Sequence, residues 1–153
     1  MIAVRDPSYL LAHPTAGYRG SDAARWFLTG LAVLMTVRSL AHILLPDGGA
    51  NLIAGIELSG PAGDNLVHLF AQWGLEQLLL AGLTWVVLLR YRFLIPFALL
   101  LQLIDWSMRF AIGEWKPLIV DSPPPGAWGN LILAPLCAVF LWLSLPKRNA
   151  RDP

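Results

Sequence analysis

The chain has few charged residues. Asp, Glu, Lys and Arg make up 14% of its 153 residues, whereas 56% are hydrophobic. An average soluble domain is about 25% charged. Because so little charge cannot cover a water-exposed surface, we expect lipid to be the main solvent. The net charge is +1 and there is no basic cluster or binding motif, which gives no basis for a nucleic-acid partner.

Other absences narrow the architecture. The single cysteine, Cys137, cannot form an internal disulfide and excludes CxxC chemistry, and its apolar neighbours predict a buried thiol. Residues 1–23 contain no sustained apolar run, so we expect no cleavable signal peptide. No segment alternates between apolar and polar residues, which argues against membrane-spanning strands.

Four segments are apolar and long enough to cross a bilayer as helices, which takes about 20 residues. Ser21 or Asp22 can cap the first, and Pro96 and Pro135 lie inside the third and fourth. We therefore predict one all-α domain over residues 1–153, an integral membrane four-helix bundle. Its predicted helices are 24–45, 64–89, 93–112 and 128–145.

The lysines and arginines predict the orientation. Arg90 and Arg92 lie in the short turn between the second and third segments, which should form an antiparallel hairpin. Further basic residues precede the first segment and follow the fourth, whereas the other two connections contain only Lys116. Because basic loops stay in the cytoplasm, we predict a multi-pass protein of a bacterial inner membrane with cytoplasmic N and C termini.

Polar and ionisable residues interrupt three of the four segments. Their spacing, mostly four residues, places each set on one face of a helix. At a rise of about 1.5 Å per residue, all three faces fall in the outer half of the membrane. The sets are Arg38 and His42; His68, Gln72 and Glu76; and Gln102, Asp105 and Arg109.

The charges in these sets balance. An isolated charge at the bilayer centre costs at least about 3 kcal/mol. We therefore predict that Asp105 pairs with Arg109 within the third helix, and that Glu76 pairs with Arg38 between the first and second. One interpretation is structural, with ion pairs and hydrogen bonds fixing helix register. The other is a polar pocket that opens to the outer side.

The pocket hypothesis predicts binding of a small or lipid-like ligand. Arg38 and Arg109 would hold an anionic group such as phosphate, sulfate or carboxylate. In this role the protein is a homo-oligomer or an accessory subunit of a larger membrane complex. The other candidate ligand-binding residues are Gln72, Gln102, Asp105, Trp73 and Trp106, although both tryptophans are equally compatible with core packing.

Two alternatives involve chemistry or a cofactor. In the first, the protein is a membrane-embedded enzyme in which Glu76 acts as acid or base, with His68 or His42, on a lipophilic substrate. In the second, His42 and His68 bind haem b or a metal. The sequence has no HxxxH, HExxH or Glu-x-x-His spacing. We therefore assign no metal ligands and no cofactor.

The order of segments also resembles a known group. The stretches are "ARWFLTGLAVLMTVRSLAHILLP", the outer loop "DGGANLIAGIELSG", "FAQWGLEQLLLAG" and "LLRYRFLIPFALLLQLIDW". In helix count, spacing and composition they are similar to small four-helix bacterial membrane proteins grouped around DoxX, over most of residues 24–145. The resemblance implies a four-helix membrane protein in a group that includes parts of quinone-linked oxidoreductases. It implies no particular catalytic residue.

Overall fold

The structure is a computed structural model that describes residues 6–11 and 17–147. This part of the chain is all-helical, and the four predicted long helices are confirmed. The second begins earlier than predicted, and Pro96 lies in the first turn of the third, where proline needs no hydrogen-bond partner. The elements are η1 (Pro7–Leu11), α1 (Asp22–Leu44), α2 (Gly60–Leu89), η3 (Arg92–Leu94), α3 (Ile95–Trp115) and α4 (Pro125–Ser144).

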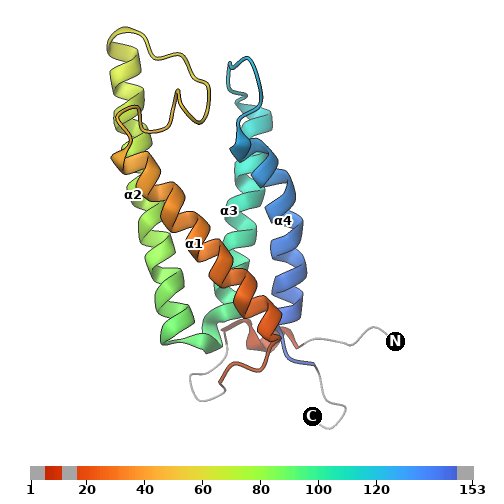
Figure 1. Cartoon of the computed structure of the whole chain (residues 1–153). Helices are drawn as coiled ribbons and strands as arrows, with labels where there is room; N and C mark the ends of the chain where they lie inside the picture. Colours follow the sequence, from red (N-terminus) through yellow and green to blue (C-terminus); the bar gives the residue numbers. More distant parts are fainter. Residues whose placement is uncertain (1–5, 12–16, 148–153) are drawn as a thin grey trace.

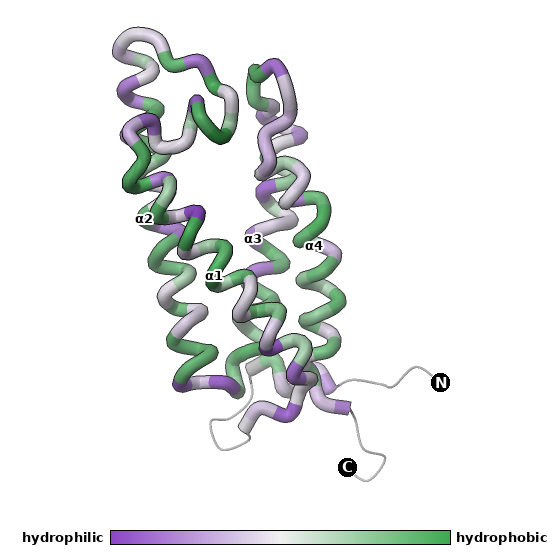
Figure 2. Tube along the Cα trace, viewed as in Figure 1, coloured by the Kyte–Doolittle hydropathy of each residue, from purple (hydrophilic) through white to green (hydrophobic). Residues whose placement is uncertain are grey.

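Each long helix is long and apolar enough to cross a membrane. Figure 2 shows hydrophobic residues along the whole length of the bundle, with hydrophilic stretches mainly at its two ends. Many of the outward side chains are large and apolar, and only 6% of the most apolar window of α4 is buried. Soluble monomers rarely expose apolar surface to this extent. The fold therefore has the surface expected of a multi-pass membrane protein.

The helices pack as two pairs. α1 lies along α2 and α3 lies along α4, while α1 also contacts α4 near its own beginning. The turn at Arg90–Tyr91 makes α2 and α3 antiparallel as predicted, but these two helices contact each other little. Figure 1 shows the α1–α2 pair and the α3–α4 pair diverging with distance from this turn.

The core is concentrated at the end where the pairs meet. One cluster there joins all four helices, and Phe27 stacks on Phe140 with ring centroids 4.1 Å apart. A second cluster above it contains Leu31, Trp106 and Cys137, so the predicted burial of the thiol is confirmed. In lipid this packing acts through van der Waals contact, since burial from lipid gives little hydrophobic gain. The first cluster consists of Ala24, Leu28, Ala32, Leu88, Ile95, Ala98 and Leu99.

Small residues bring α1 and α2 close together. A Cβ atom added at Gly74 would lie 2.8 Å from the His42 Cβ and 3.0 Å from the Ser39 carbonyl oxygen. Nearer the shared turn, Trp85 Nε1 donates a hydrogen bond to Thr36 Oγ1 at 3.1 Å. This pairing decides which face of α2 is covered.

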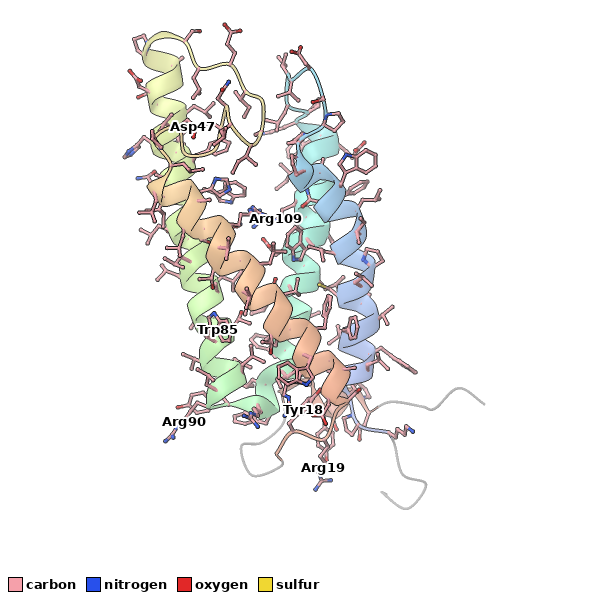
Figure 3. The ribbon with its side chains drawn as sticks, viewed as in Figure 1. Tyr18, Arg19, Asp47, Trp85, Arg90 and Arg109 are labelled. Atoms are coloured by element: carbon pink, nitrogen blue, oxygen red, sulfur yellow. The ribbon has the colours of Figure 1, made fainter. Side chains whose placement is uncertain are left out.

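The beginning of α1, the end of α4 and the basic α2–α3 turn lie at one end of the bundle, where Figure 3 labels Arg19 and Arg90. Ser21 caps α1 by accepting from the Ala23 N–H, and its own N–H donates to the Leu143 carbonyl. The connection from α1 to α2 lies at the opposite end. Its turn places Gly48 and Gly49 at positive φ, a conformation that favours glycine.

α2 is longer than its neighbours. Its 30 residues span about 45 Å at 1.5 Å per residue, whereas a bilayer hydrocarbon core is about 30 Å thick. The extra length lies at the end away from the basic turn (Figure 1). Measured from Leu89, Glu76 is about 20 Å along the helix and so falls inside a hydrocarbon core, while His68 lies near its far boundary.

Candidate functional site

Two arginines and two tryptophans form a compact cluster between the helix pairs. Arg38 of α1 lies over the Trp73 ring of α2, with Cζ 4.7 Å from the ring centroid, and 5.8 Å from that of Trp106 of α3. Arg109 of α3 contacts the same two rings at 5.1 and 5.5 Å. Figure 3 shows Arg109 pointing from α3 toward the α1–α2 pair. Both tryptophans thus hold cations through their ring faces.

The cluster contains one carboxylate for its two cations. Arg109 Nε donates to Asp105 Oδ2 at 2.8 Å, which confirms the predicted pair within the third helix. The predicted pair between Arg38 and Glu76 is wrong: among the described residues Arg38 forms no ion pair, and Glu76 is exposed on α2. The reason is that α2 turns the face with Gly74, Gln77 and Ala81 toward α1, and Glu76 is not on this buried face. The cluster therefore carries one positive charge in excess.

Three buried polar side chains in or next to the cluster lack hydrogen-bond partners within the described part of the chain. Gln102, fully buried one turn before Trp106, has neither its amide nitrogen nor its oxygen paired. Trp106 Nε1 and Ser39 Oγ, on the residue after Arg38, are also unpaired. Burying a polar group without a hydrogen bond costs about 1–3 kcal/mol. Each is a buried donor or acceptor whose hydrogen-bonding capacity is unused within this part of the chain.

His42 connects the cluster to the outer loop. Its Nδ1 donates to the Gly48 carbonyl at 2.7 Å, and its ring packs against Phe70 and Trp73. The ring thus fixes the position of the Trp73 indole and anchors the turn after α1. This arrangement gives His42 a positioning role beside the arginines.

The stripe His68, Gln72 and Glu76 lies elsewhere. All three side chains are exposed, whereas the buried residues of α2 lie on the face toward α1. The structure therefore brings together Arg38, His42, Trp73, Gln102, Asp105, Trp106 and Arg109, but not the three stripe residues. The acid–base hypothesis, which pairs Glu76 with His68 or His42, and the haem hypothesis, which pairs His42 with His68, stay predictions.

Two hollows in the described part of the chain lie at the ends of the bundle. One, of about 370 Å³, adjoins Tyr9 and Arg19, and the other, of about 340 Å³, adjoins Asp47 and Asp64. Neither hollow is lined by Arg38 or Arg109. No three His, Cys, Asp or Glu side chains within residues 6–11 and 17–147 gather in a metal-binding group.

Comparison with known proteins gives no relatives: no protein-family model, curated protein or solved structure matches the chain. The resemblance to DoxX-like proteins therefore stays a prediction. The class that the structure itself defines is an all-helical protein with four helices capable of spanning a membrane.

Sequence reasoning missed two features of the site. Ser39 received no ligand role, although it is buried and unpaired next to Arg38. Asp47 was not singled out, yet its carboxylate accepts hydrogen bonds from the backbone of Gly49, Asn51 and Leu52 and shapes the loop that His42 holds. The signal for Asp47 was the Asp-Gly-Gly tripeptide, a typical turn sequence.

Proposed function

We propose that the protein is a multi-pass protein of a bacterial inner membrane that binds the anionic headgroup of a lipid-like molecule. The site is the cluster of Arg38 and Arg109 with Trp73 and Trp106. The observation that carries the proposal is the pair of guanidinium groups on the same two indole rings with Asp105 as their single carboxylate. Basic segments at the other end support cytoplasmic termini and a site in the outer half.

Charge favours this ligand class. Two cations within contact of the same rings repel each other, and Asp105 compensates for only one of them. Guanidinium groups bind phosphate and carboxylate oxygens through paired N–H donors. Gln102 and the Trp106 N–H add unpaired polar groups that suit an oxygen-rich headgroup.

The position of the cluster favours an amphipathic ligand. Arg38, Asp105 and Arg109 are half-buried, and Trp73 is 39% exposed, so the site is reachable without unfolding. It lies where the two helix pairs diverge, and the outward side chains around it are apolar, including Ile104 and Met108 of α3. A lipid-like ligand would match both features, with its acyl chain along the apolar surface and its anionic group at the arginines.

The test is lipid retention by the Arg38→Gln variant. Protein reconstituted in phosphatidylcholine vesicles containing phosphatidylglycerol is extracted in mild detergent, and bound lipid is counted by native mass spectrometry. We expect wild-type protein to retain the anionic lipid and R38Q to bind it about tenfold more weakly, since a hydrogen bond to a charged group contributes about 1.5–3 kcal/mol. The matched control, Arg90→Gln, removes an exposed arginine from the opposite end.

Equal retention by wild type and R38Q contradicts the proposal, as does a loss of the same size in R90Q. A separate arm adds inorganic phosphate to lipid-free protein. If phosphate alone binds as tightly as the phospholipid, the ligand is a free anion and the lipid-like part of the proposal is wrong.

A further inference from the structure

The buried residues of α2 follow a seven-residue repeat. From Gly74 onward they are spaced three, four, three and four residues apart, at Gly74, Gln77, Ala81, Thr84 and Leu88. Gly63, eleven residues before Gly74, is in the same register and is covered by Leu58 of the loop before α2. Val67 and Phe70 are half-buried at the intervening positions of the same repeat. This "buried seam" is the pattern of left-handed helix pairs, in which alternating steps of three and four keep one face toward a partner.

A second seven-residue repeat runs along α2 two residues out of step. Its steps are four, three, four, three, four and three residues, and every member is exposed. An offset of two residues is about 200° around a helix, so this "exposed seam" faces away from α1. It consists of Asn65, Leu69, Gln72, Glu76, Leu79, Leu83 and Val86.

The exposed seam has two chemically different parts. Near the basic turn it contains Leu79, Leu83 and Val86, which suit lipid or a packed neighbour equally. Further out it contains Gln72 and Glu76, and Glu76 lies inside the span of a hydrocarbon core when measured from Leu89. Polar side chains at such a depth are costly in lipid and are satisfied by other protein groups. Within the described residues, no side chain forms an ion pair with Glu76 and none forms a hydrogen bond with Gln72.

We propose that the exposed seam is an interface with a second copy of this chain. The two α2 helices lie parallel and are related by a two-fold axis along the membrane normal. Each residue of the seam then contacts the same residue of the partner helix or the seam residue three or four positions away. The Gln72 amide of one protomer donates to the Glu76 carboxyl oxygen of the other, and symmetry repeats the bond. Nearer the basic turn, the apolar side chains of the two seams interdigitate, namely those of Leu79, Leu83 and Val86.

The seam itself points to a second copy as the occupant. Its one ionisable residue is Glu76, and the Gln72 amide that can donate to this carboxyl group lies on the same surface. Amide and carboxyl groups in adjacent layers complement each other when the same surface is applied twice. The repeat is unbroken over about 30 Å, the full thickness of a hydrocarbon core, which suits a helix pair more than a local contact. The inference is independent of the anion site, because no residue of the arginine and tryptophan cluster belongs to the exposed seam.

The direct test is a cysteine scan along α2 in native membranes. Single cysteines are placed in a Cys137→Ala background and oxidised with copper phenanthroline. Because a disulfide needs Cβ atoms about 3.5–4.5 Å apart, we expect about tenfold more cross-linked homodimer from L69C, Q72C, L79C and L83C than from Q77C and T84C of the buried seam. Leu136→Cys, exposed on α4, measures random collision in the membrane.

A cross-linking maximum at the exposed seam, repeating every three to four residues, supports the proposal. Cross-links no more frequent than those of L136C, or a maximum on another face of α2, overturn it. Cross-linking of the seam only to a different protein also overturns it, because the second copy is then not the occupant.

Substitution of the polar pair tests the bonds themselves. In vesicles, Q72L/E76L should raise the dimer dissociation constant about tenfold, which corresponds to about 1.4 kcal/mol. E76Q should keep the wild-type constant, because an amide accepts from Gln72 as a carboxyl group does. Glu114→Leu, an exposed carboxylate off the seam, is the matched control. A dimer of Q72L/E76L as tight as wild type overturns the assigned contacts, and a circular-dichroism comparison shows that each variant is folded.

Discussion

Asp47 organises the loop above the candidate site. Its carboxylate accepts from the backbone N–H groups of Leu52 at 2.7 Å and Gly49 at 2.9 Å, and these bonds hold its pKa below the ordinary value of 3.8. The same loop carries Gly48, whose carbonyl accepts from His42. One half-buried carboxylate therefore influences the order of the loop, and through His42 the position of Trp73.

The lowered pKa of Asp47 predicts an acid-sensitive loop. A group whose pKa is lower in the folded state stabilises that state above its unfolded pKa and loses this contribution as the pH falls through the folded pKa. We therefore expect the amide protection factors of Gly49 and Leu52 to be constant above pH 5 or so and to fall below about 3.8. Hydrogen exchange at several pH values measures this.

Asp47→Ala supplies the comparison for that experiment. It should show low protection at Gly49 and Leu52 at every pH, without the acid transition. Asp121→Ala removes an exposed carboxylate from the other outer connection and should leave the transition unchanged. An acid transition that persists in D47A would mean that another group controls the loop.

Gly74 sets the separation of α1 and α2. Because an added Cβ would lie 2.8 Å from the His42 Cβ, Gly74→Ala should force the helices apart and lower the free energy of unfolding by about 1–3 kcal/mol. Reversible unfolding in mixed micelles measures the change. Gly30→Ala on α1, where nothing lies within 4 Å, should leave stability unchanged or raise it. Equal stability of G74A and G30A would contradict the tight contact.

The helices themselves were predictable because hydropathy and length are properties of each segment alone. Ser21 indicated the start of α1, and the predicted helices agree with the observed ones to within a few residues at most ends. The pairing of helices was not predictable in the same way. The short turn at Arg90 indicated an α2–α3 hairpin, but packing is decided by surface shape, and the small residues of α2 fit α1 instead.

The candidate site was predictable only in part for the same reason. The pair of Asp105 with Arg109 is local, at four residues on one helix, and it is confirmed. Glu76 was placed inward by the rule that polar residues in a membrane face protein. Within one chain that rule competes with the close approach allowed by Gly74 and Ala81, and the small residues determine the contact. Their seven-residue spacing was the available signal.

The arrangement of the four helices predicts the accessibility of each end of the bundle. The basic turn at Arg90 and the connection near Ser122 lie at opposite ends of the described structure (Figure 1). With cytoplasmic termini, S122C should react with a membrane-impermeant maleimide in intact spheroplasts, whereas R90C should react only after permeabilisation. The native Cys137 is buried, so labelling of the wild-type protein gives the background level of the reaction. Labelling of R90C in intact spheroplasts would reverse the proposed orientation.

The excess length of α2 makes the protein responsive to bilayer thickness. A helix that exceeds the hydrocarbon core tilts, protrudes or deforms the surrounding lipid, at a cost of fractions of a kcal/mol per Å of mismatch. In a thin bilayer Gln72 and Glu76 approach the hydrated headgroups, and in a thick one both lie deeper in the hydrocarbon. For the dimer proposed above, acyl-chain length alone would then tune how strongly two copies associate, and membrane composition would regulate assembly without a ligand or a covalent modification.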